Sequence, residues 1–164
     1  MQLNSSAKEI RSVRMTDLLE AADETGPTPF NTVKEQTFLF GEGLLGFPQY
    51  KNYQLERFRP ADGTETPFFV LRCLDDELSF PVIHPASLGI DYHFPINHEL
   101  LTALGAASGD ALVVLLIVTV RDRIENTTVN LQGPLVMNPG SGLGLQLVVE
   151  QYPLRHPMLI QIEY

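Results

Sequence analysis

Between residues 33 and 150, short apolar runs rich in β-branched and aromatic residues alternate with clusters of turn-forming residues. Successive side chains of an extended strand point to opposite faces, so this period of two predicts half-buried strands. Many short strands of this kind are typical of a small sandwich or barrel. The pattern predicts strands at residues 33–40, 53–58, 68–74, 78–83, 112–120, 128–131, 135–138 and 143–150.

A single segment has the spacing of a good helix. Asn97 can cap its first turn, and Leu100, Leu101 and Leu104 form an apolar stripe on one face. We therefore expect a mostly β fold with one short helix near residues 97–104.

Residues 1–30 are predicted to be an N-terminal extension and linker, ahead of a single domain at residues 31–164. Asp17 and Glu20 have the spacing of a capping box, which favours a short helix, but the alternation at residues 13–15 suits a strand equally well. Two prolines and a glycine near the end of the extension indicate a loop before the domain. The secondary structure of the extension therefore stays open.

The stretch VNLQGPLVMNP, residues 129–139, places asparagines and a Gly-Pro pair inside an apolar run. Pro134 has no N–H to donate to a neighbouring strand, so the step from Gly133 to Pro134 predicts an edge, a bulge or a bend. Asparagines beside turns commonly bond to local backbone groups. We assign Asn130, Pro134 and Asn138 to the architecture of the fold and not to a chemical site.

The composition is that of a folded domain, with 164 residues of which 44% are hydrophobic and 19% are charged. Cys73 is the one cysteine of the chain, so no intrachain disulfide is possible, and its apolar neighbours indicate a buried structural thiol. The longest apolar run, residues 111–118, is too short to cross a membrane. The mixed charges of the N-terminus do not form a signal peptide, so we expect a cytoplasmic protein that does not bind membranes.

Acidic residues outnumber basic ones by 20 to 11, which gives a formal net charge of -9. Direct nucleic-acid binding is disfavoured, because it normally needs a basic surface that displaces counterions from phosphates. The acidity is explained either by solubility or by attraction to a basic partner, and charge alone does not decide between them.

Candidate chemistry is sparse along the chain. Residues 140–144, GSGLG, lack the ending of a phosphate-binding loop and lead into an alternating strand. His84, His93 and His98 lie near Asp91, which suggests a metal-assisted enzyme as one alternative. Their spacing matches no common metal motif, which favours surface or loop histidines. A small-ligand-binding β-barrel is a further alternative, although the chain has no tryptophan to serve as an aromatic platform.

Three stretches together resemble one family, the flagellar assembly factor FliW. They are TFLFGEGLLGF at residues 37–47, PFFVLRCLDDELSFPVIHPASLGIDY at residues 67–92, and LLIVTV at residues 115–120 followed by VNLQGPLVMN. The resemblance covers about residues 37–158, and Gln146 fits the closing strand. In this chain His84 stands before Pro85, where the family pattern leads us to expect an acidic residue.

The resemblance implies a compact single-domain antiparallel β-barrel-like fold and a protein that needs no cofactor and catalyses no reaction. It implies two partners, flagellin and the small basic RNA-binding translational regulator CsrA. When flagellin is exported, the freed factor would capture CsrA and relieve repression of flagellin messenger RNA. Our predicted partner contacts are Phe47, Pro48, Tyr50, Asp75, Glu77, Asp91 and Tyr92. The aromatic residues of this set could equally be core residues, and the acidic ones could equally be solvated turn residues.

Overall fold

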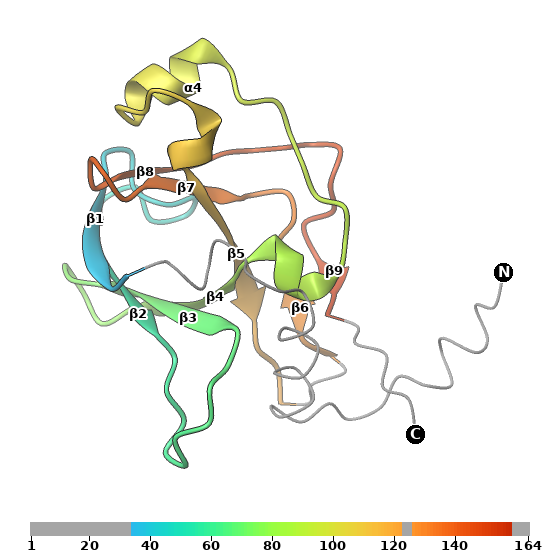
Figure 1. Ribbon diagram of the computed structural model, residues 1–164. Coiled ribbons are helices and arrows are strands. Elements are labelled where there is room, and N and C mark those ends of the chain that lie inside the picture. Colours follow the sequence, from blue (N-terminus) through green and yellow to red (C-terminus); the bar gives the residue numbers. More distant parts are fainter. Residues whose placement is uncertain (1–33, 123–125, 159–164) are drawn as a thin grey trace, which may run out of the picture.

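The computed structural model describes residues 34–122 and 126–158 (Figure 1). The predicted extension at residues 1–30 lies outside these ranges. No helix of the described ranges is long and apolar enough to cross a bilayer. The strands are β1 (Gln36–Phe40), β2 (Asn52–Arg57), β3 (Phe68–Cys73), β4 (Ser79–Ile83), β5 (Val113–Thr119), β6 (Thr128–Val129), β7 (Leu135–Asn138), β8 (Leu143–Gln146) and β9 (His156–Pro157). The helices are α4 (His98–Ala103) and the 3₁₀ turns η1 (Pro85–Leu88) and η2 (Gly109–Ala111).

The main strands form a closed barrel in the order β1-β2-β3-β4-β5-β7-β8, with β8 returning to β1. Strand β5 also pairs with β6 at its end, and β6 pairs with β9. Closure gives both edges of the sheet a partner, which removes most of the unpaired backbone that an open sheet exposes. The structure confirms the predicted mostly β, barrel-like fold.

One pairing departs from the predicted antiparallel arrangement. Strands β1 and β8 run parallel and are joined in register at Leu39–Leu143 and Phe40–Gly144. The alternation of residue types predicts that a segment is a strand, but it does not say which strand lies beside it. This parallel pairing therefore appears only in the tertiary structure.

The strand boundaries follow the hydrophobic pattern closely. The prediction at residues 135–138 coincides with β7, and the other predicted strands overlap β1 to β6 and β8. Strand β8 ends at Gln146 rather than at residue 150. Strand β9 was not among the predicted strands, because two residues are too few to show an alternation.

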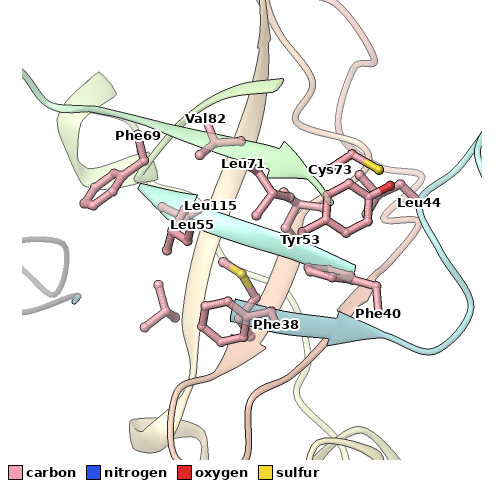
Figure 2. Packing of buried hydrophobic residues seen from close by; sticks show 13 residues of the cluster. Phe38, Phe40, Leu44, Tyr53, Leu55, Phe69, Leu71, Cys73, Val82 and Leu115 are labelled. Atoms are coloured by element: carbon pink, nitrogen blue, oxygen red, sulfur yellow. The ribbon is translucent and has the colours of Figure 1, made fainter. Parts of the chain in front are cut away.

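Inward-facing side chains of the barrel strands form the largest core cluster (Figure 2). Phe38 and Phe40 come from β1, Tyr53 from β2, and Leu115 from β5, and all are almost fully buried. Cys73 lies in the same cluster as a buried free thiol. Burial of each large apolar side chain contributes about 1.5–3 kcal/mol, so this cluster provides the main stabilisation of the barrel.

Two smaller clusters lie outside the barrel. One contains Phe68, Leu116 and Val129 and is covered by the segment around η1. The other places Leu100 and Leu104, from α4 and its C-terminal end, against Val136 of β7. The barrel wall is therefore buried on both faces where β5 and β7 pass beneath these covers, which explains why Val136 is as buried as the interior residues.

The predicted cap of the helix is confirmed, because Asn97 Oδ1 accepts a hydrogen bond of 2.8 Å from the Leu100 N–H. Asn138 Nδ2 donates to the Leu104 carbonyl at 2.8 Å and so ties β7 to the end of α4. Asn130 Oδ1 accepts from the Gly133 N–H at 2.8 Å and closes the turn before Pro134. Both asparagines therefore serve the fold, as the sequence predicts.

Gly144 is required where the Phe40 ring packs against β8. A Cβ at this position would lie 2.6 Å from Phe40 Cζ, which is too close for any carbon pair. We expect Gly144→Ala to lower the free energy of unfolding by about 1–3 kcal/mol, because a rigid core ring has to move. Urea unfolding measures the change.

Gly41→Ala is the matched control, since a Cβ there meets nothing within 4 Å. Its stability should equal that of the unmodified protein or exceed it slightly. Equal stability of the Gly144→Ala and Gly41→Ala proteins would contradict the packing argument.

Candidate functional site

Two segments that are distant in sequence meet at one end of the barrel. They are the loop at residues 41–50, between β1 and β2, and the turn at residues 75–77, between β3 and β4; we call them the loop–turn surface. Asp75 Oδ2 accepts from the Lys51 N–H at 2.8 Å and from the Asn52 N–H at 3.1 Å. These bonds form because β2 and β3 are antiparallel neighbours, so that the start of one lies beside the end of the other.

Aromatic residues join the loop to the turn and to the barrel. The Tyr50 hydroxyl donates a hydrogen bond to Asp76 Oδ2. The Phe47 ring stacks on Tyr50, with centroids 6.4 Å apart, and meets the edge of the Phe80 ring at 5.7 Å. Phe47 and Tyr50 are half-buried, whereas Pro48 between them is exposed. The loop therefore presents two aromatic rings and a proline, and the rings are held in place by Phe80 and Asp76.

The loop has a defined backbone conformation. Gly43 has a φ of 69°, and a Cβ there would lie 2.5 Å from the Phe47 carbonyl oxygen. The Lys51 ammonium donates to the Gly41 carbonyl at 2.8 Å and to the Pro48 carbonyl at 3.3 Å. A side-chain cation thus satisfies two loop carbonyls and brings the ends of the loop together.

Gln146 of β8 fastens the middle of the loop to the barrel. Its Oε1 accepts from the Leu45 N–H at 2.7 Å, and its Nε2 donates to the Gly133 carbonyl at 2.9 Å. One amide side chain therefore links the loop to the Gly-Pro bend that precedes β7. The sequence pattern does not predict this role for Gln146, because Leu45 and Gly133, the residues that it links, are far apart in sequence.

The loop–turn surface carries several carboxylates. Glu42, Asp76 and Glu77 are exposed. The Tyr50 hydroxyl lowers the pKa of Asp76, and the backbone N–H groups of Lys51 and Asn52 lower the pKa of Asp75. Both aspartates are therefore ionised at neutral pH. The surface combines negative charge with aromatic and proline contacts.

Asp91 and Tyr92 belong to a different part of the molecule. The Tyr92 hydroxyl donates to the Leu131 carbonyl at 2.7 Å, and its ring lies against Tyr152 with centroids 4.5 Å apart. Burial raises the pKa of Tyr92. Asp91 is exposed and lies 3.3 Å from His93 Nδ1. The structure thus brings five of the seven predicted contact residues together and leaves these two beside the outer cluster at η1.

The histidines of the metal-enzyme alternative have separate local partners. His84 Nδ1 accepts from the Ala86 N–H at 3.0 Å and caps η1, and burial lowers the pKa of His84 to about 4. His93 contacts Asp91, and His98 Nε2 lies 3.4 Å from the Thr102 hydroxyl. Within residues 34–122 and 126–158, no three His, Cys, Asp or Glu side chains are placed to hold a metal ion. The geometry gives this alternative no support.

Comparison with known proteins agrees with the fold. The family profile described as FliW protein matches residues 22–159. The chain belongs to the FliW family of flagellar assembly factors. The flagellar assembly factor FliW of Natranaerobius thermophilus is 33% identical over 130 residues, covering 76% of this chain and 83% of that protein. That of Treponema denticola is 33% identical over 131 residues, covering 78% and 86%.

A solved structure gives the same result. The crystal structure of the flagellar assembly factor FliW matches with a TM-score of 0.67 at 27% sequence identity, covering 77% of this chain and 88% of that chain. The first FliW-like stretch, residues 37–47, includes the loop as far as Phe47, and the second, residues 67–92, contains the turn of the loop–turn surface. His84, which departs from the FliW pattern that we expected, caps η1 through its side chain, and an acidic side chain can also fill this role.

The partial burial of His84, which lowers its pKa, makes the stability of the fold depend on pH. Because the pKa of His84 is about 4 in the folded protein against an ordinary 6.5, the unfolded chain binds a proton more readily. The free energy of unfolding that neutral His84 contributes is fully present above pH 6.5, and it is lost as the pH falls toward 4. We expect His84→Asn, which keeps an acceptor for Ala86, to reduce the loss between pH 7 and pH 5 by on the order of 1 kcal/mol. Urea unfolding at both pH values measures it, and an unchanged loss would contradict the assignment.

Gln146→Met should loosen the loop while leaving the barrel closed. Methionine has a similar length but offers neither the acceptor for Leu45 nor the donor for Gly133, and each lost bond costs about 0.5–1.5 kcal/mol. We expect faster amide hydrogen exchange at Leu45, with little change at Phe38 in the core. Gln151→Met, at an exposed position, is the control. Unchanged exchange at Leu45 would contradict the proposed link.

Proposed function

We propose that this FliW family member binds flagellin and the basic translational regulator CsrA in the cytoplasm, and that it catalyses no reaction. Its membership in a family of flagellar assembly factors supports a role with flagellar proteins. The observation that carries the proposal is the convergence of Phe47, Pro48 and Tyr50 with the acidic turn at residues 75–77 on one surface. This surface has the composition of a protein-binding site, with aromatic anchors beside exposed charges.

The charge of the surface favours the regulator as a partner. Glu42 and Glu77 are exposed and carry no compensating ion pair among the described residues. With a net charge of -9, the whole chain adds to the attraction of a basic protein. Asp75 uses its oxygens to hold the turn, so we expect it to act by positioning the turn and Glu77 to contact the partner directly.

Asp91 and Tyr92 form a second proposed contact region, beside the outer cluster at η1. Asp91 is exposed and can pair with a cation, whereas Tyr92 is half-buried and already bonded to Leu131. We therefore expect Asp91 to contribute through charge and Tyr92 through the exposed edge of its ring. Two regions of this kind suit a protein that exchanges one partner for another. Export of flagellin would then release the chain to capture CsrA.

Charge reversal at Glu77 tests the main surface. We expect Glu77→Lys to weaken binding to the CsrA homologue of the same organism about tenfold at low salt, because an attraction becomes a repulsion. Glu65→Lys is the matched control, since Glu65 is also exposed, on the hairpin between β2 and β3. Isothermal titration at two salt concentrations gives both affinities.

The outcomes separate the function from its location. If the folded protein binds neither the regulator nor flagellin, the proposed function is wrong. If it binds the regulator but Glu77→Lys and Glu65→Lys have equal affinities, the function stands and the loop–turn surface is the wrong location.

A further inference from the structure

The chain continues in an extended conformation after β8. The Leu147 N–H donates to the Pro134 carbonyl at 2.9 Å, and the Val149 N–H donates to the Gln132 carbonyl at 2.7 Å. Successive residues of an extended chain direct their amide groups to opposite sides. The backbone of Val148, between these two residues, therefore faces away from the strand that its neighbours bind.

On the side that the Val148 backbone faces, strand β1 no longer pairs with the chain. Along β8 that neighbour is β1, but the pairing stops at Phe40–Gly144 because the chain turns into the loop at Gly41. Across residues 34–122 and 126–158, no backbone group bonds to the Val148 N–H. Val148 is 56% exposed. Within the described part of the chain, the barrel thus has a short free edge just beyond the place where β1 closes it.

A groove of about 480 Å³ follows this edge. Phe94 and Pro95, which lead into α4, form part of its wall opposite the segment from Leu147 to Gln151. Figure 1 shows the chain leaving β8 as a single extended path, with the segment that enters α4 crossing close by. Pro95 has no N–H, so the facing wall offers apolar contact in place of a competing donor at that residue. Of the described residues that line the groove, Glu150 alone is charged.

We propose that residues 146–150 form a docking site at which an extended segment of a partner protein adds as a β-strand. The partner segment would be extended, because only a strand presents backbone donors and acceptors at the spacing of those along the edge at Val148. Alternate apolar side chains of that segment would contact Val148 and Phe94. A lysine or arginine of the segment would lie near Glu150, whose charge has no cation beside it in the groove lining.

This docking site is distinct from the loop–turn surface and does not depend on the proposed function. Its occupant is defined by chemistry alone: an extended peptide with alternating apolar residues and a nearby basic residue. The loop and the docking site are joined through Gln146, whose side chain bonds to Leu45 while its backbone begins the free edge.

Selection of a random linear-peptide library on the full-length protein tests the proposal. We expect enriched peptides to share alternating apolar residues with a lysine or arginine. Their affinity should fall at least about tenfold for Val148→Pro, which removes the edge N–H, and stay within about twofold for Val148→Thr, which keeps it. Glu150→Lys should weaken binding several-fold, whereas Glu77→Lys should leave it unchanged.

Val148→Pro spares the bonds that Leu147 and Val149 make, so the fold should persist, and its amide spectrum verifies this. A second test leaves the protein unchanged: N-methylation of alternate residues in an enriched peptide should abolish binding in one register and spare it in the other. The proposal is overturned if no peptide is enriched, if enriched peptides bind Val148→Pro as tightly as Val148→Thr, or if N-methylation in either register has no effect. Strong protection of the Val148 amide in the free full-length protein would also overturn it, because the edge would already be occupied.

Discussion

The parallel pairing of β1 with β8 closes the barrel, and much of the molecular surface follows from how short this pairing is. Only Leu39–Leu143 and Phe40–Gly144 are in register, and the close approach at the second pair needs a glycine beneath the Phe40 ring. The chain then leaves the sheet at Gly41. That departure creates the loop at residues 41–50. Among the described residues, it also leaves the backbone beyond Gly144 without a neighbouring strand on the side of β1.

Polar side chains of the protein itself order the loop. The Lys51 ammonium satisfies loop carbonyls, Asp75 satisfies the first N–H groups of β2, and Gln146 links Leu45 to Gly133. Because these polar groups have partners inside the molecule, the loop does not have to become ordered when a partner binds. Preorganisation of this kind lowers the entropic cost of association. The side chains that remain available, such as Pro48 and Glu77, are then held on a fixed base.

Hydrogen-bond partners within the molecule also separate structural polar residues from contact residues. His84 looks like a candidate ligand in the sequence, yet it is a half-buried neutral cap of η1, and partial burial lowers its pKa. Tyr92 resembles an exposed aromatic contact, yet its hydroxyl is bonded to the Leu131 carbonyl. A residue type alone does not distinguish these roles, because the distinction depends on which backbone group lies within hydrogen-bonding distance.

The sequence by itself determined the class of the fold, most strand positions, the Asn97 cap and the turn-forming bonds of Asn130 and Asn138, because these follow from local periodicity and local hydrogen bonds. The bond from Asn138 to the distant Leu104 carbonyl was decided by the tertiary structure. It also supplied the FliW resemblance and the acidic charge. Only the tertiary structure decided the parallel closure, the bridge made by Gln146, the joining of the loop to the turn, and the separation of Asp91 and Tyr92 from them. These features pair groups that are far apart in the chain, such as Leu45 with Gln146. The pattern of residue types along the chain does not reveal such pairs, because they form only when closure of the barrel brings distant segments together.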